Sequence, residues 1–368
     1  MDASMTSDTT FRNALSVTLV VVVIATVVAV LGWRLLEFDR ALFLYAMALI
    51  ASLGLTVYRF VIWAHRPPTK KLYARAFTML RSLHDAVALS KHLAKRVVGY
   101  FALNSFVWRR GLTRWGAHWP IMIGCVIAMA VVVPLIFGWV WFESEPSDLH
   151  SYKVMAFGQH LRTIPVDGVE AFVAFHGLVW AAFFVTAGTS VALWRRLRDR
   201  GDQATQAFGN DIAPLLILLA IAITGLLMTV SYSFLGGAFH APLAKVHMLI
   251  VIGTLIWLPF SKLFHIPQRT LKLAHMVYEH ESGAGPKAEC ARCGVEFAEQ
   301  QHINDLISIQ QELGYQYEIT GTTNHYQWIC PQCRRASLVI AQSSRWRNSA
   351  SNAVSNAVSL ASSNQPIG

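Results

Sequence analysis

Apolar residues gather in six long runs separated by polar connections. The runs cover approximately residues 14–36, 41–64, 119–141, 171–194, 212–234 and 244–264. A helix needs about 20 consecutive apolar residues to cross the hydrocarbon layer of a bilayer, and each run is that long. The pattern therefore predicts an all-α integral membrane protein whose main body is a six-helix transmembrane bundle.

The overall composition agrees with this fold class. The chain is 54% hydrophobic and 14% charged, whereas soluble globular proteins carry about 25% charged residues. The net charge of +10 raises the question of nucleic acid, but the cations lie in connections beside the apolar runs, and no basic face with interleaved aromatic residues occurs elsewhere. We therefore expect a lipid bilayer, and not nucleic acid, as the surroundings of this chain.

The charges in the connections predict an orientation. The connection from His65 to Ala117 carries eleven Lys or Arg and a single acid, Asp85. Basic residues also follow the fourth and sixth runs, whereas acids outnumber bases between the third and fourth. Because short cytoplasmic loops are enriched in Lys and Arg, we expect both termini to be cytoplasmic. The first run lacks a small-residue cleavage site and is expected to remain as a membrane helix.

The region after residue 280 is polar and carries two CxxC motifs, CARC and CPQC. Two such pairs supply four thiolates for a tetrahedral metal ion, and a cytoplasmic location disfavours disulfides. The sequence predicts a small metal-ribbon domain over 281–341 whose ligands are Cys290, Cys293, Cys330 and Cys333. The metal is expected to be zinc or a single iron, since the motifs also resemble the two knuckles of rubredoxin, with a longer gap and with Arg334 in place of a glycine.

The last stretch, residues 342–368, is rich in Ser, Asn and Ala and contains the echo SNAVSNAVS. Such a segment cannot bury enough apolar surface to compensate the entropy of ordering it. We predict a disordered tail.

Histidines stand near both ends of the last apolar run. His247 and His265 are 18 residues apart, which in a continuous helix is five turns and about 27 Å of rise. Both rings would then leave one helix face, one near each membrane surface. Haem iron takes axial imidazole ligands between packed helices, so each ring needs a partner at its own depth on another helix.

Two further histidines supply such partners. His118 opens the third run and would pair with His265 near the cytoplasmic surface. His176 lies about one turn into the fourth run and would pair with His247 near the outer surface, with His240 as a shallower competitor. We therefore expect one or two haem b groups.

The final run also carries a family resemblance. VHMLIVIGTLIWLPFSKLFHI resembles the last membrane helix of the respiratory nitrate reductase gamma subunit, a family that includes the b-type cytochrome subunits of heterodisulfide-reductase-like complexes. NDIAPLLILLAIAITGLLMT resembles the helix before it. The resemblance implies an extra N-terminal helix over 1–40, a cytochrome b membrane domain over 41–280, and then the cysteine domain and the tail.

The resemblance also implies haem ligands. The family's last helix supplies one ligand to each of two haems, and these match His247 and His265, while the first partner histidine matches His118. The second partner position falls on Ala128, so His176 is the expected replacement. If His176 does not face His247, we expect His247 to form a hydrogen bond with a quinol headgroup.

Three further positions bear on this resemblance: a possible sulfur ligand, the lysine of the quinol site and a cation for a haem propionate. Met129 is turned by about 100° from the position of Ala128 and is a poorer ligand candidate. The lysine of the family's quinol site falls near the apolar Val169. Of the arginines before the first ligand histidine, Arg109, Arg110 and Arg114, the last is expected to pair with a haem propionate.

The implied function is electron transfer. The chain would be the quinol-oxidising subunit of a multi-subunit oxidoreductase in a bacterial inner membrane, passing electrons between quinone and an iron–sulfur partner on the cytoplasmic face. Two alternatives stay open: a haem-free membrane anchor that recruits a partner through a zinc ribbon, and a transporter, although no charge lies in the middle of any run.

Overall fold

The structure, a computed structural model, describes residues 3–32, 40–81, 86–145, 148–283, 285–318 and 325–346. These residues form two compact units. The membrane unit comprises Met1–His65 and His84–Leu273, and the cysteine unit comprises Arg66–Leu83 and Ala274–Gly368.

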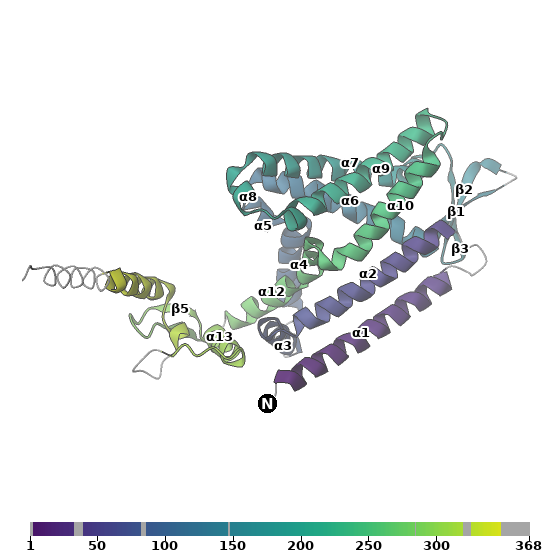
Figure 1. Ribbon diagram of the computed structural model, residues 1–368. Coiled ribbons are helices and arrows are strands. Elements are labelled where there is room, and N and C mark those ends of the chain that lie inside the picture. The colour runs from purple at the N-terminus through teal and green to yellow at the C-terminus, as the bar shows by residue number, and fades with distance from the viewer. Residues whose placement is uncertain are drawn as a thin grey trace, which may run out of the picture. The chain divides into compact units, whose positions relative to one another are not determined.

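Six helices of the membrane unit are long and apolar enough to cross a bilayer (Figure 1). They are α1 (Ala3–Gly32), α2 (Arg40–Ala64), α6 (Leu112–Ile136), α7 (Val169–Arg198), α9 (Ala213–Phe234) and α10 (His240–Trp257). The prediction of a six-span helical protein is confirmed for the described residues. The third spanning helix, α6, begins seven residues before the apolar run predicted over 119–141. His118 therefore lies in the second turn of α6.

The spanning helices form a ring with one helix outside it. In the order α2, α10, α9, α7 and α6 each helix packs against the next, and α6 also contacts α2. Helix α1 packs mainly along α2 (Figure 1). The first apolar run is therefore attached to a bundle made by the other five.

The closest helix packing joins α6 and α7. A Cβ atom added at Gly188 would lie 2.6 Å from the carbonyl oxygen of Ala117, and one at Gly124 would lie 2.6 Å from that of Ala181. Both contacts are with backbone, so the two helices touch where a side chain is missing. Small residues allow this approach in membrane helices, where close packing replaces the hydrophobic effect as the source of association.

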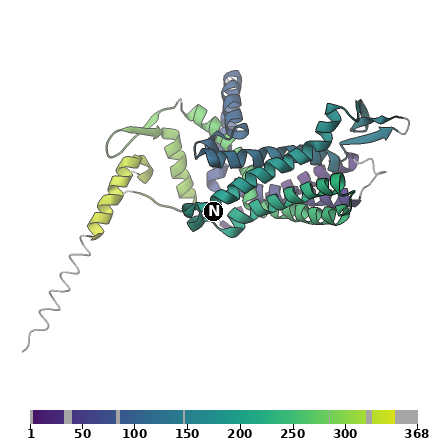
Figure 2. The same cartoon turned by 90° about the horizontal axis from the view of Figure 1, so that it is seen from above.

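The connection between α6 and α7 is a sheet, which the all-α prediction missed. Strands β1 (Val140–Glu145), β2 (Asp148–Ala156) and β3 (Gln159–Pro165) pair antiparallel in that order at one end of the bundle (Figure 2). Phe157 and Gly158 join β2 to β3 with φ angles of 48° and 81°, the left-handed conformation that two-residue hairpins favour. The alternation of apolar and polar residues here was too short to separate from the flanking helices.

The long basic connection and the other loops contain short helices. The membrane unit has α4 (Ala86–Val97), α5 (Ser105–Trp108), α8 (Arg200–Thr205) and the π-helical turns η1 (Val98–Ala102) and η2 (Phe208–Ile212).

The last membrane helix is not continuous, so the predicted five-turn phase between His247 and His265 is wrong. Helix α10 ends at Trp257 and is followed by the 3-10 turns η3 (Leu258–Phe260) and η4 (Lys262–Phe264) and by α11 (His265–Gln268). Ser261 between the turns is extended, with φ −90° and ψ 179°. Pro259 lacks an N–H and its ring clashes with the preceding turn, which ends an α-helix.

The cysteine unit draws in more of the chain than residues 281–341. It contains α3 (Pro67–Arg81), most of α12 (Thr270–Ser282), β4 (Lys287–Glu289), β5 (Glu296–Glu299), α13 (Gln300–Glu312), η5 (Tyr326–Trp328) and a helix over 331–346. Asp305 on α13 accepts hydrogen bonds from Arg75 at 3.0 Å and from Tyr278 at 3.1 Å. These contacts attach α3 and α12 to α13.

The predicted disordered tail starts inside an ordered element. The final helix includes residues 342–346, because it continues without interruption from the second cysteine pair. The rest of that prediction, residues 347–368, lies outside the described residues.

The α6–α7 contact gives a first prediction. Gly188→Ala should force the two backbones apart and lower the free energy of unfolding by about 1–3 kcal/mol, measured as thermal stability of the full chain in detergent. Gly253→Ala in α10 is the matched control, because a Cβ there meets nothing within 4 Å. Equal stability of the two variants would contradict the packing described above.

Candidate functional site

The ring of His265 is oriented by a hydrogen bond to the backbone of the preceding turn. Its Nδ1–H donates to the carbonyl oxygen of Lys262 at 2.7 Å. His265 is exposed as a residue. Partial desolvation of its ring lowers its pKa, the hydrogen bond to Lys262 opposes this, and the nearby cations Arg269 and Lys262 lower it further. In the neutral ring the Nε2 atom carries a lone pair that can bind a metal.

His118 lies at the same site. His265 and Arg269 are both within electrostatic range of the half-buried His118 ring. Its Nδ1 atom is buried and has no hydrogen-bond partner in the described part of the chain. A buried nitrogen without a partner is costly, so this ring calls for a ligand. The two histidines come from different elements and lie within electrostatic range of each other.

The helix break that positions His265 is held by Arg59 of α2. In a continuous helix the Pro259 carbonyl would pair with the Leu263 N–H. Here the Arg59 guanidinium donates to the Pro259 carbonyl and lies over the Phe264 ring at 4.4 Å. The Leu263 N–H donates to Ser261 Oγ at 3.1 Å. Both groups freed by the break are therefore satisfied.

An ion pair holds the same turn from the other side. The Lys262 ammonium contacts the carboxylate of Asp211, and Asp211 also lies 3.6 Å from Arg196. These contacts connect η4 to η2 and to the end of α7. The residue that accepts from the His265 ring is thus itself fixed.

Arg269 and Asn104 complete this site and were missed in the sequence. The Arg269 guanidinium donates to Asn104 Oδ1 at 3.2 Å and lies 4.8 Å from the Phe106 ring centre. Asn104 is fully buried, in the left-handed conformation with φ 48°. Arg269 follows His265 by four residues, one helical turn, and this spacing was the only signal available.

Arg114, the expected propionate partner, is engaged elsewhere. Its Nη2 lies 3.5 Å from the Asp202 carboxylate, which also pairs with Arg195. Arg109 and Arg110 are exposed. The cation beside the two histidines is therefore Arg269.

His247 at the other level packs against α9. Its Nδ1 lies 2.8 Å from the hydroxyl of Thr224, which donates its own proton to the carbonyl of Ala220 at 2.7 Å. The Nδ1–H of His247 is therefore the donor in the shared bond, which leaves the lone pair of the neutral ring on Nε2. A Cβ at Gly225 would lie 3.6 Å from the ring, so the glycine leaves room for it.

The structure does not bring His176 to His247. The His176 ring is exposed, stacks on Phe172 with ring centres 4.2 Å apart, and bonds the Phe172 carbonyl through Nδ1 at 2.9 Å. Its helix α7 packs on α6 and α9, whereas α10 packs on α9 and α2. Helix α9 thus separates the two rings. Met129 on α6 is 48% exposed and does not replace it.

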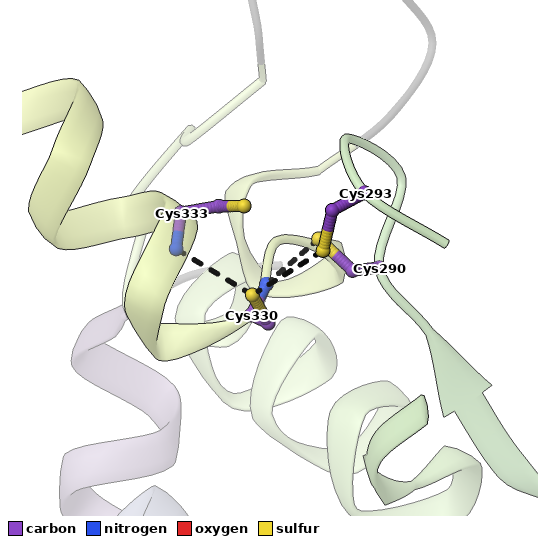
Figure 3. Close-up of side chains that lie close together, drawn as sticks. All are labelled: Cys290, Cys293, Cys330 and Cys333. Atoms are coloured by element: carbon purple, nitrogen blue, oxygen red, sulfur yellow. Dashed lines mark hydrogen bonds between the residues drawn. The ribbon is translucent and has the colours of Figure 1, made fainter. Parts of the chain in front are cut away.

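The four cysteines form a second site, in the cysteine unit. The Sγ atoms of Cys290, Cys293, Cys330 and Cys333 all lie within 4.8 Å of one another (Figure 3). Cys290 and Cys330 are buried. Four converging thiols from two CxxC motifs can hold one tetrahedral zinc or iron ion, as the spacing predicted.

Backbone N–H groups point at the first cysteine pair. Burial raises the pKa of Cys290, but the backbone N–H groups of Cys330, Arg292 and Cys293 outweigh it and lower the pKa to about 6. The Cys330 N–H donates to Cys290 Sγ at 3.2 Å. Gly294, with φ 73°, closes the turn around this pair. The site therefore stabilises a thiolate, the form that binds metals.

The second pair is built differently, from the start of the helix over 331–346 (Figure 3). Arg334, at the position of a rubredoxin glycine, is helical, and its guanidinium donates to the carbonyls of Ile329 at 2.7 Å and Gln327 at 2.9 Å. One turn and one helix end surround the cluster, in place of the two equivalent knuckles of rubredoxin.

A scan of protein-family models and searches of curated proteins and of solved structures find no match for the chain. The resemblance to the nitrate reductase gamma subunit therefore rests on the quoted residues and stays a prediction.

The cysteine cluster predicts one bound metal ion per chain. Cys290→Ser and Cys330→Ser should each lower the metal content by removing a buried ligand, measured by elemental analysis of the full chain. Cys125→Ser is the control, because Cys125 lies in α6 and outside the cluster. Unchanged metal content in both cluster variants would rule out this site.

The Arg59 contact predicts a local effect. Arg59→Leu should leave the Pro259 carbonyl unpaired, at a cost of about 1–3 kcal/mol, and so raise amide hydrogen exchange over residues 258–265. Arg109→Leu, at an exposed arginine, should leave that exchange unchanged. If both variants exchange alike, the break is held by something other than Arg59.

Proposed function

We propose that this protein is a membrane electron-transfer subunit that holds one haem b between His118 and His265. The observation that supports the proposal is the electrostatic proximity of two imidazoles from separate elements, with His265 Nδ1 bonded to the Lys262 carbonyl and His118 Nδ1 buried without a hydrogen-bond partner in the described chain. Bis-imidazole ligation is a common way to hold haem b in a helical bundle. When bound, haem supplies a one-electron redox centre.

Arg269 supports the same proposal. A half-buried guanidinium fixed by Asn104 beside the two rings is a suitable partner for an acidic group of the cofactor. Arg114 has no such role in the proposal, since Asp202 already pairs with it.

A single haem is proposed because, among the described residues, no second imidazole is found beside His247. His176 lies beyond α9 and Ala128 offers no ligand. The Nε2 lone pair of His247 suits a hydrogen bond from a quinol hydroxyl, which places quinol oxidation at the opposite end of α10 from the haem.

The topology and partners follow from charge. The basic connections favour a multi-pass protein of a bacterial inner membrane with both termini in the cytoplasm. The cysteine unit is then cytoplasmic, and its metal is proposed to be zinc, since the cluster lacks rubredoxin's paired knuckles. An iron–sulfur subunit of an oxidoreductase would receive the electrons on that side, as the resemblance implies.

The second candidate is a haem-free anchor that recruits a partner through its zinc site. The converged cysteine cluster favours it, as does the missing ligand at Ala128. An absorption spectrum of protein from haem-replete cells distinguishes the two, because only the first predicts b-type bands.

His118→Ala and His265→Ala should each abolish the same b-type absorption bands, because one imidazole alone does not hold the haem. His176→Ala should retain them, since that ring faces away from both candidate ligands. A colourless wild-type protein would overturn the proposal. Loss of the bands in His176→Ala would show that the ligand pair is wrongly assigned.

The role proposed for His247 is tested by quinol oxidation. His247→Ala should keep the haem spectrum and slow reduction of the haem by a quinol analogue, measured by stopped-flow absorption. His240→Ala is the control. Loss of haem in His247→Ala would instead show that His247 is an iron ligand.

A further inference from the structure

One face of α3 presents apolar and basic side chains together. We define this face by Lys70, Phe77, Leu80 and Arg81, whose spacing places them on one side of a helix. Phe77 is 55% exposed and Leu80 is 47% exposed. Lys70 and Arg81 are exposed as well. An aromatic and a leucine side chain in such positions are unfavourable in water, so this face calls for a cover.

The rest of α3 is already occupied. Thr69 and Ala76, which border Leu80 round the helix, are buried, and the helix packs on α13 of the same unit. Arg75 and Lys71 pair with Asp305, at 3.0 Å and 3.6 Å. The helix cannot roll to bury its outer face without breaking these contacts. Its basic residues are thus divided, with Arg75 and Lys71 used within the unit and Lys70 and Arg81 directed outward.

The chain brings the start of α3 close to the end of a membrane span. The second membrane span ends at Ala64, and only two residues separate it from Pro67, where α3 begins. Consecutive Cα atoms are 3.8 Å apart, so the start of α3 lies within about 11 Å of the end of that span. If the span ends where the hydrocarbon ends, the first turn of α3 lies among the lipid headgroups, because the polar regions of a bilayer begin there.

The chemistry of the face fits that depth. Helices that lie in a membrane surface combine large apolar residues with flanking Lys and Arg. The Arg81 guanidinium lies 4.2 Å from the centre of the Phe77 ring, so the charge and the apolar surface are adjacent. Anionic headgroups attract such cations. A face made only for water would carry the two cations without Phe77 and Leu80.

We propose that α3 lies on the membrane surface through this face and binds anionic phospholipid headgroups. This inference is independent of any haem or quinol. It assigns α3 two functions: packing against α13, and contact with lipid.

The test uses the full-length protein with a photoreactive phenylalanine analogue in place of Phe77. The protein is reconstituted into nanodiscs of phosphatidylcholine, with or without phosphatidylglycerol, and crosslinked lipid is measured by mass spectrometry. Thr78 is the control position, because it is exposed but turned by about 100° round the helix. We expect lipid adducts from position 77 and few from position 78.

The anionic preference is tested with charge reversal. Phosphatidylglycerol should raise the yield of lipid adducts at position 77 several-fold, and added salt should reduce this gain. Lys70→Glu combined with Arg81→Glu should remove the gain, since each cation near an anionic surface changes binding by about fivefold. Zinc content measured on the same samples verifies that the cysteine unit is intact.

Three results would overturn the proposal. They are adducts to protein instead of lipid at position 77, equal lipid yields at positions 77 and 78, or the same yield with and without phosphatidylglycerol. The first would show that a protein surface covers the face. The haem spectrum, present or absent, changes none of these outcomes.

Discussion

A carbonyl group that loses its helical partner beside a bilayer must find another donor, since water is scarce there. In this protein the extended Ser261 removes the helical donor of the Pro259 carbonyl, and Arg59 donates to that carbonyl in its place. The compensated break ends α10 and starts a new turn at His265. Where the His265 ring stands therefore depends on a guanidinium from α2, some 200 residues earlier in the chain. The inner site is a consequence of this interruption.

The two histidines of that site are anchored independently. His118 belongs to α6, which packs closely on α7 at Gly188 and Gly124. His265 follows a turn that the Lys262–Asp211 ion pair connects to η2. The two rings are therefore positioned by separate sets of contacts.

The cysteine unit is organised in a different way. One of its buried clusters surrounds the cysteines, with Cys290, Ile329 and Cys330 buried together. Metal binding and folding are coupled at such sites. Asp305 extends the unit by fastening α3 and α12 to α13. Helix α3, which follows the second membrane span in the sequence, thus belongs to the same unit as the cysteines, which follow the sixth span.

The sequence by itself determined the six membrane helices and the four-cysteine cluster, because apolar length and the CxxC spacing are local properties of the chain. It also pointed to His118 and His265. It could not determine the break at Pro259, since a proline near a helix end can kink, cap or terminate it. Only the tertiary structure decided that Arg269 joins the inner site and that α9 separates His247 from His176, because which side chains meet depends on the order of helices round the bundle.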